Sequence, residues 1–443
     1  MSLSSPVASA SALMLALFAP VAFGQTDKEK ELEARIEQLE KLVQQMSTQS
    51  AAKPATPPPT AADQPAQNTT ITPTASPTTK FRYGGFIKFD AIYTDTPDGE
   101  IADGTAGRLF YFPSTIPVGA AGASESGDLD FSAQLSRFWF GADTTLSSGS
   151  KLTSYLEFDL YGGGSNAFLG NETATNTYGL TVRHAWVSWD KWLAGQTWSN
   201  FQDVAALPDT VDFIGPTEAT IFVRQAQLRY TTGAWTLSLE NPETTVTPFG
   251  GATARIASDD NSIPDLIARW TTRGTWGHLS VAGMVRQLKY QNPATRIDDS
   301  TIGGALSVSG KWNFGANDDI RFMLNAGSGI GRYLGLAISS DTVLNSTGGL
   351  DAIDGLGAYV GYRHVFNRSV RGNVFYSLAR FDNDIRLTGG SVTESVESAH
   401  INLIYSPLPK LDLGAELIFA ERDIESGLDG ELRRLHMHVR YNF

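Results

Sequence analysis

The chain has no cysteine among its 443 residues. Disulfides, thiolate catalysis and thiolate-bound metal sites are therefore excluded. Charged residues make up only 18% of the sequence, which is low for a soluble chain of this size, and after the first 24 residues no run is apolar enough for a membrane helix. The net charge of −13 argues against nucleic acid as a partner. The six scattered histidines form no recognisable Ser/His/Asp constellation, so we expect neither an enzyme nor a cofactor.

Glycine and aromatic residues, by contrast, are plentiful. The chain contains 43 Gly, 23 Phe, 14 Tyr and 9 Trp. Strand-forming aromatics and glycine-rich loops, without a spanning helix, are typical of a transmembrane β-barrel.

The last twelve residues carry the clearest strand pattern. The chain stops on an aromatic residue while the alternation is still running, which resembles the C-terminal signal that the barrel assembly machinery of outer membranes recognises. Facing lipid at mid-bilayer would cost an arginine roughly 2–4 kcal/mol, so Arg440 is expected to face a lumen. Leu435, Met437, Val439, Tyr441 and Phe443 alternate with Arg434, His436, His438, Arg440 and Asn442.

The first 24 residues are expected to be a secretory signal peptide. Residues 13–23 are apolar, and small residues at 22 and 24 precede a predicted cut before Gln25. No Lys or Arg comes before the apolar stretch, which a mis-assigned start would explain. We expect the mature chain in the outer membrane of a Gram-negative bacterium.

Two further segments precede the strands. Residues 25–49 have apolar positions at alternating spacings of four and three, which predicts a short coiled coil in the periplasm; a lone amphipathic helix is the alternative. The heptads leave open whether two or three helices associate. Residues 50–79 are rich in Pro, Ala and Thr and cannot bury a core, so they are predicted to be an extended or disordered linker.

Residues 80–443 consist of short segments of alternating polarity. About sixteen strands can be placed, an even number as bacterial barrels require, and their connections alternate between short and long. A barrel of this size leaves an aqueous channel. The predicted strands cover 81–94, 131–146, 151–162, 179–190, 192–199, 222–231, 234–241, 263–272, 275–290, 301–314, 318–327, 356–366, 370–382, 395–406, 410–421 and 432–443.

Charge is unevenly placed along this predicted barrel. Residues 80–443 contain 22 Arg, 7 Lys and 40 Asp or Glu, so the barrel is acidic overall. Many acids fall in the long loops, whereas a set of basic residues falls within strands. Inward guanidinium groups would attract carboxylates, because their fork geometry suits bidentate pairing. The predicted channel-lining residues are Lys88, Arg137, Arg183, Arg229, Arg269, Arg286, Arg321, Arg363, Arg371 and Arg440.

Each of these arginines has a structural alternative. It would pair with an acid across the lumen and hold the wall together; the candidate acids are Asp90, Glu157, Asp159 and Glu416. Two histidines on one face of the last strand, at 436 and 438, have a spacing that suits a metal. No inward carboxylate is evident near them, so lumen lining is the better interpretation and no metal site is expected.

Several segments resemble a known family. They are residues 195–201, reading Gly-Gln-Thr-Trp-Ser-Asn-Phe, with 206–210 and Arg224-Gln225, and residues 85–91 followed by 112–118. Together they resemble the DcaP-like family of outer-membrane porins, and the order of signal peptide, coiled coil, spacer and barrel matches too. The resemblance implies a trimeric channel, a periplasmic N-terminal coiled coil and a preference for small anions such as dicarboxylates.

The connection 200–221 is the third long loop, which in porins folds into the lumen. Pro208 and Pro216 stiffen it. Acids on an infolded loop opposite basic strands would set up a transverse field that orients small zwitterions or anions. An external loop with solvated charges is the alternative. The predicted constriction residues are Phe201, Asp203, Asp209, Asp212 and Glu218.

The sequence therefore predicts an all-β transmembrane antiparallel barrel of about 16 strands, preceded by a short α-helical coiled coil. It would let small hydrophilic solutes diffuse through an Arg-lined channel. The expected partners are outer membrane lipid and lipopolysaccharide, two further copies in a homotrimer, and small anions. A general or phosphate-selective porin is one alternative. Another is an envelope-spacing or adhesion barrel, plugged by the loops 95–130 and 328–355.

Overall fold

In the computed structural model, the described residues are 41, 69–71, 78–119, 127–162, 176, 178–251 and 254–443. The chain divides into two compact units, residues 1–63 and 64–443, and every element below belongs to the second. The predicted signal peptide lies outside the described residues. So do the predicted coiled coil, apart from Lys41, and the linker, apart from residues 69–71, 78 and 79.

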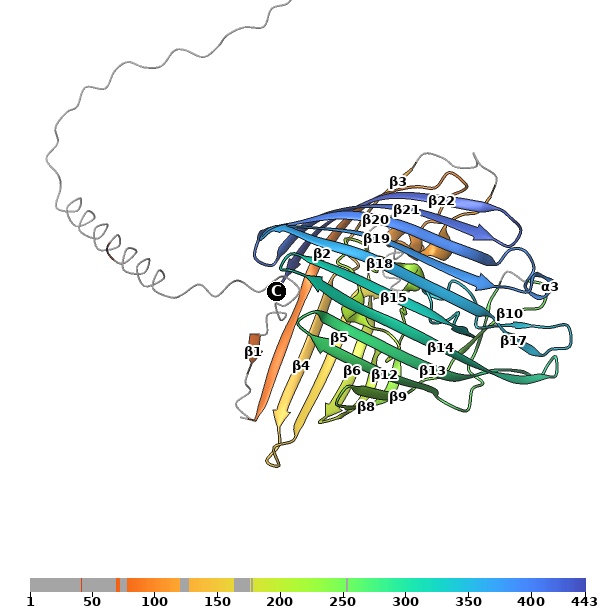
Figure 1. Cartoon of the computed structure of the whole chain (residues 1–443), viewed down its shortest axis with the longest axis horizontal. Coiled ribbons are helices and arrows are strands. Elements are labelled where there is room, and N and C mark those ends of the chain that lie inside the picture. Colours follow the sequence, from red (N-terminus) through yellow and green to blue (C-terminus); the bar gives the residue numbers. More distant parts are fainter. Residues whose placement is uncertain are drawn as a thin grey trace, which may run out of the picture. The chain divides into compact units, whose positions relative to one another are not determined.

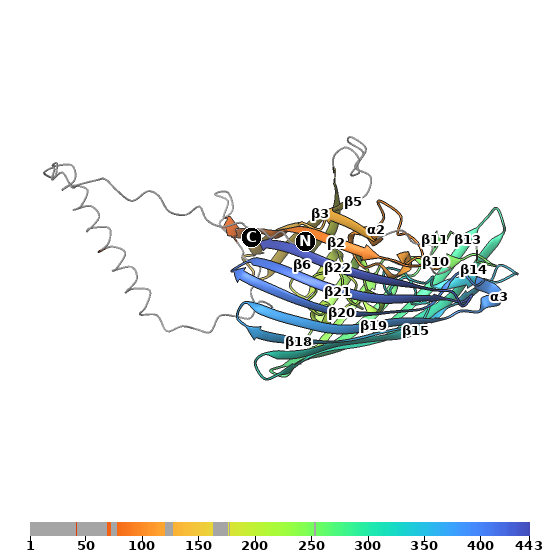
Figure 2. The same ribbon diagram turned by 90° about the horizontal axis from the view of Figure 1, so that it is seen from above.

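One antiparallel sheet curls into a closed barrel (Figures 1 and 2). β2 closes it by pairing with β22 along one edge and with β3 and β4 along the other. β3 and β4 pair with successive stretches of β2, so together they count as one strand position in the wall. The described residues form sixteen such strand positions. The prediction of a barrel of about 16 antiparallel strands is confirmed.

The wall strands match the predicted segments closely. They are β2 (Thr79–Asp95), β3 (Asp128–Ser132), β4 (Arg137–Thr145), β5 (Lys151–Gly162), β6 (Gly179–Trp189), β7 (Trp192–Trp198), β8 (Arg224–Thr232), β9 (Trp235–Glu240), β12 (Asp265–Gly274), β13 (Gly277–Asn292), β14 (Ile297–Phe314), β15 (Asp318–Ser328), β18 (Asp354–Asn367), β19 (Val370–Asp382), β20 (Thr393–Leu408), β21 (Leu411–Ile424) and β22 (Asp429–Asn442).

Short and long connections lie at opposite ends of the barrel. Tight connections such as 190–191 and 409–410 lie at the end that holds the C-terminus, here called the turn end (Figure 1). The other end, the loop end, carries the short helical elements α2 (Ala106–Leu109), η1 (Pro113–Thr115) and α3 (Ile385–Thr388). Among the described residues, no helix is long and apolar enough to cross a membrane.

Two local irregularities correct the predicted strands. The segment 131–146 is interrupted between Ser132 and Arg137, where Ser136 accepts a hydrogen bond from the backbone N–H of Lys88 at 3.0 Å. In β6 the register shifts, because Val182 and His184 pair with adjacent residues of β5 and leave Arg183 unpaired. Such a bulge lets two successive side chains point to one face, and Arg183 and His184 are both buried.

Five short strands of the described residues lie outside the wall. β1 (Thr69–Ile71), within the predicted linker, pairs with β2 at residues 81–83, which lie beyond the end of β22. β10 (Thr244–Thr247) and β11 (Ile256–Ser258) form one hairpin, and β16 (Thr342–Leu344) and β17 (Leu350–Ala352) form another. The parallel pairing of β10 with β16 joins the two long loops that contain them. Alternation over three or four residues is too short to predict such strands.

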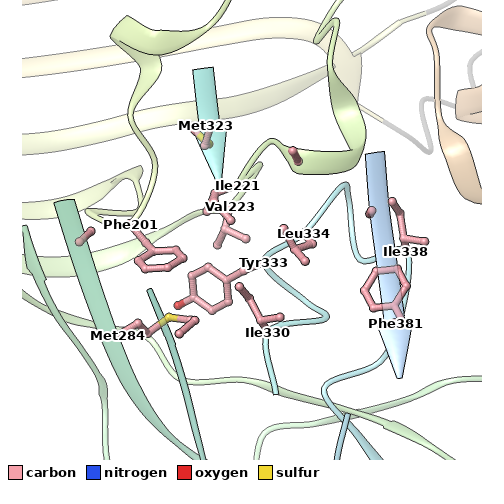
Figure 3. Close-up of a cluster of buried hydrophobic side chains, with 14 of the residues drawn as sticks. Phe201, Ile221, Val223, Met284, Met323, Ile330, Tyr333, Leu334, Ile338 and Phe381 are labelled. Carbon is pink, nitrogen blue, oxygen red and sulfur yellow. The ribbon is translucent and has the colours of Figure 1, made fainter. Parts of the chain in front are cut away.

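An apolar core fills part of the barrel interior (Figure 3). Tyr333, Ile330 and Leu334 of the loop 329–353 pack there against Phe201 and Met284. The core also takes wall residues from β12, β13, β14, β15, β18, β19 and β20. We call the interior of these seven strands the packed side.

Glycines on the inner face of β18 make room for this packing. A Cβ atom on Gly357 would lie 2.9 Å from Leu334 and 3.0 Å from the Cα of Ala219. Side chains there would push both inner loops away from the wall, so the absence of a side chain is what allows the loops to lie against the strand.

Candidate functional site

The loop 200–221 lies inside the barrel and follows its wall. From Trp198, the last residue of β7, to Val211, the chain contacts basic side chains of β8, β12, β15, β19 and β2 in turn. This is the order in which these strands follow one another around the wall. Each contact is a hydrogen bond from a basic group to an oxygen of the chain: Arg229 Nη2 to Trp198 O (2.6 Å), Arg269 Nη1 to Gln202 O (2.7 Å), Arg321 Nη1 to Leu207 O, Arg371 Nε to Asp209 Oδ2 (2.5 Å) and Lys88 Nζ to Val211 O (2.9 Å).

The acids of this loop point to partners on the wall or on another loop. Asp203 Oδ2 lies 2.8 Å from His278 Nε2, and Asp212 Oδ1 lies 3.4 Å from His436 Nδ1. Both carboxylates are buried and face these histidines, so they are shielded from the remaining lumen.

The first long loop binds the third. Asp212 accepts the backbone N–H of Tyr111 at 2.8 Å, and Glu218 accepts the Tyr111 hydroxyl. Burial raises the pKa of Tyr111 well above its usual range and the carboxylate of Glu218 raises it further, so the hydroxyl keeps the proton that it donates.

Two carboxylates of the loop have lowered pKa values. Burial raises the pKa of Asp209, but the hydrogen bond and charge of Arg371, together with the charges of Arg440 and Arg363, bring it below its ordinary value. For Asp212, burial is likewise outweighed by the combined effect of His436 and the backbone N–H groups of Ile214 and Tyr111. Ionised acids and wall bases together therefore anchor the loop.

Wall acids neutralise part of the predicted arginine set. Arg137 and Arg183 share Glu157, at 3.4 and 2.9 Å from its Oε1, and Arg183 also lies 2.7 Å from Asp159 Oδ2. These ion pairs join β4, β5 and β6, which is the wall-holding alternative weighed from the sequence.

The turn-end half of the lumen has a second group of ion pairs. Asp319 faces Arg321 at 2.8 Å and Arg363 at 3.4 Å, and Asp412 lies 2.9 Å from Arg440 Nη2. Each carboxylate lies between two guanidinium groups, since Arg371 also reaches Asp412 at 3.3 Å. Positive charge is therefore in excess there.

Arg286 is placed differently from the rest of the set. Its side chain is fully buried on the packed side, 2.8 Å from Asp341 and 3.4 Å from Asp265, with the guanidinium over the ring of Tyr333. There it ties the loop 329–353 to the wall.

Three half-buried arginines on β8 and β12 have no ion pair with any described acid. Arg229 and Arg269 donate to neutral backbone carbonyls, so no carboxylate in direct contact neutralises their charges. The third, Arg224, stacks on Trp198 at 5.0 Å and was missed as a lining residue, although the motif Arg224-Gln225 contains it. Arg224 is the first residue of β8, where the alternation of polar and apolar residues does not predict to which face a side chain points.

The two terminal histidines also need a correction. His436 Nε2 lies 2.8 Å from Asp90 Oδ1, so a carboxylate does face it, brought there from β2 by closure of the barrel. Within the described residues, no three His, Asp or Glu side chains gather to hold a metal ion. His436 acts here as the partner of an acid, as does His400, which lies 2.8 Å from Glu416. His438, by contrast, lies 3.3 Å from the backbone carbonyl of Val211.

The two sides of the barrel interior are unequal. The strands β4 to β8 lie opposite the packed side. Inward side chains there, such as Arg137 and Tyr155, and the loop residue Phe213 are partly exposed. We call this the open side. A solute passing through the barrel would meet guanidinium groups and rings there, and this geometry supports binding and passage of anions.

Comparison with known proteins agrees with this architecture. The model of the DcaP outer membrane protein family matches residues 38–443. The crystal structure of the outer membrane channel DcaP of Acinetobacter baumannii is 22% identical, with a TM-score of 0.69 over 84% of this chain and 99% of that one. Salmonella typhi OmpF in complex with daunomycin is 11% identical, with a TM-score of 0.52 over 83% of this chain and 98% of that one.

No functionally curated protein matches the sequence. The likeness to solved structures shows the fold, a porin-type barrel. Because the family model spans most of the sequence, from the predicted coiled coil to the last strand, the chain belongs to the DcaP outer membrane protein family.

Proposed function

We propose that the chain is a passive outer-membrane porin that prefers small anions, dicarboxylates among them. The observation that carries the proposal is the charge balance in the lumen. The acids of the loop 200–221 that point to the wall are held by bases, whereas Arg224, Arg229 and Arg269 have no ion pair among the described residues. Uncompensated guanidinium groups in a narrow lumen raise the local concentration of anions.

The lining is proposed to be the predicted basic set without the fully buried Arg183 and Arg286, and with Arg224 added. The predicted constriction residues narrow the lumen by holding the loop to the wall. A dicarboxylate suits this lining because two guanidinium groups can bind its two ends at once, each through a bidentate pair.

The test is the reversal potential of the purified protein in a planar bilayer under a potassium chloride gradient, repeated with sodium succinate. We expect reversal towards the anion potential in both salts. Replacing Arg229 and Arg269 together with glutamine is expected to lower the anion preference.

A matched variant with lysine at both positions keeps the charge while changing the contacts with the loop. Equal losses of anion preference in the glutamine and lysine variants would assign the effect to loop displacement and contradict the charge argument. Wild-type reversal towards the cation potential would overturn the proposal.

We further propose that the chain is exported by the segment 1–24 and works as a homotrimer, with residues 25–49 as a periplasmic coiled coil and 50–79 as its linker. The outer face of β2 and its neighbour β3 supports an interface between copies, because Phe89 and Phe131 are exposed there and stack at 5.7 Å. Mass measurement in detergent, with and without residues 26–49, tests both the trimer and the role of the coiled coil.

A barrel with a plugged lumen is the second candidate. The burial of Tyr333 and Tyr111 inside the barrel favours it, because both come from long loops that were expected to form such a plug. Absence of conductance in the bilayer experiment would support a plugged spacer or adhesion barrel instead of a porin.

A further inference from the structure

Five aromatic rings form a continuous row on the open side, here called the aromatic strip. It runs Tyr161, Phe110, Phe213, Phe222 and Trp198, with ring centroids 5.7, 5.1, 5.7 and 4.8 Å apart in that order. The rings come from the end of β5, from the first and third long loops, and from the end of β7. Nothing in the local alternation of the sequence brings these segments together.

Two arginines lie along the strip. Arg183 stacks over Phe213 at 5.3 Å, and Arg224 lies over both Trp198 and Phe222, at 5.0 and 5.5 Å. The Nη1 atom of Arg224 is buried and has no hydrogen-bond partner among the described residues. A guanidinium group that only stacks on aromatic rings can still donate hydrogen bonds to a ligand. Its N–H groups lie in the plane of the group, and stacking does not use them.

The rings of the strip are more exposed than those of the packed side. All except Phe110 are partly exposed, whereas Phe201 and Tyr333 of the apolar core are at most 1% exposed. Because these partly exposed rings lie beside the guanidinium group of Arg224, one solute can contact an apolar surface and a positive charge at the same time.

We propose that the aromatic strip and Arg224 form a subsite for carboxylates with an apolar body, in which the hydrocarbon lies on the rings and the carboxylate pairs with the guanidinium. The proposal deepens the proposed function, on which it rests, by naming the part of the solute that the rings select. Solutes with one carboxylate and a hydrocarbon chain are then bound in preference to equally long polyhydroxylated ones, because hydroxyl groups lose water on the rings without gaining partners.

The experiment compares hexanoate with gluconate as blockers of chloride current through single channels. Both anions have six carbons and one carboxylate, and only gluconate carries hydroxyl groups along the chain. We expect hexanoate to halve the current at a concentration several-fold lower than gluconate. Phe222→Gln and Trp198→Gln should each weaken the hexanoate block by roughly 2- to 10-fold, the range of one aromatic contact, and leave gluconate almost unchanged.

Two controls make the result specific. Trp189→Gln makes the same exchange at an exposed ring on the outer face near the turn end, and should leave both blocks as in the wild type. Arg224→Gln should weaken both anions, since it removes the charge that they share.

The failure of this inference differs from the failure of the proposed function. Chloride-selective current with equal block by hexanoate and gluconate, or with no effect of the strip variants, would overturn the subsite and leave the porin intact. Cation-selective current, or none, would overturn the proposed function and with it the subsite.

Discussion

The two sides of the barrel interior are built from the same kinds of residues but use them differently. On the packed side, Tyr333 and Arg286 are buried in a tight core that binds a long loop to the wall. On the open side, Phe222 and Arg224 also stack, at 5.5 Å, but both remain partly exposed and Arg224 has no described acid beside it.

The difference shows that residue type alone does not predict whether a side chain inside a wide barrel stabilises the fold or faces the solute. An arginine that is compensated and buried stabilises a loop, whereas an uncompensated arginine beside free space provides a field for solutes. Under the proposed function, the first use narrows the lumen and the second gives the preference for anions.

The largest expected effect comes from breaking the packed side. Arg286→Met leaves Asp265 and Asp341 buried without their shared cation, which should lower the free energy of unfolding by about 3–5 kcal/mol. Urea unfolding in lipid vesicles measures the loss. The exposed ion pair of Arg386 with Asp384 provides the control, because Arg386→Met should leave the free energy of unfolding nearly unchanged. Equal losses for the two variants would contradict the assignment of Arg286 to structure.

A smaller effect is expected from the opposite kind of arginine. Arg440 is partly exposed in the turn-end half of the lumen, and its partner Asp412 keeps Arg371 as a second cation. Arg440→Gln should reduce the anion-to-cation permeability ratio by at most about 5-fold, because a unit charge acting through water is worth only about 1 kcal/mol at 4 Å. The reversal potential reports the change, and Arg440→Lys should retain the wild-type ratio. A loss of stability as large as that of Arg286→Met would remove the distinction between the two uses of arginine.

The smallest expected effect is an absence of pH dependence. Since the pKa of Asp212 is lowered in the folded protein, its contribution to stability is complete above the unfolded pKa near 3.8 and is lost only as the pH falls through the folded pKa. The difference in unfolding free energy between wild type and Asp212→Asn should therefore stay constant from pH 7 to about 4.5. A change in this difference between pH 7 and about pH 5 would show that the loop anchor titrates with a histidine instead.

Much of the wall was predictable because strand signals are local. In β22, Leu435 and Met437 alternate with His436 and His438, and this period of two fixes which face meets lipid wherever the strand lies. The prediction slipped near residues 179–190 for a local reason too: the bulge at Arg183 adds one residue and reverses the parity beyond it.

The interior was harder to predict because its contacts join distant residues. The sequence did place the loop 200–221 as the third long loop, but it did not indicate that Asp203 would meet His278 or that Asp212 would meet His436. The glycines at 355, 357 and 361 of β18 were an available signal, since a bare inner face indicates that something packs closely against it.

The sequence by itself determined the barrel, the outward apolar face of its strands and the order of short and long connections, because each depends on neighbours one or two residues apart. Only the tertiary structure decided which arginines are compensated and which rings form the aromatic strip. Both depend on loops that contact segments 70 or more residues away, such as Asp203 with His278 and Tyr111 with Glu218, and no local pattern encodes where such a loop packs.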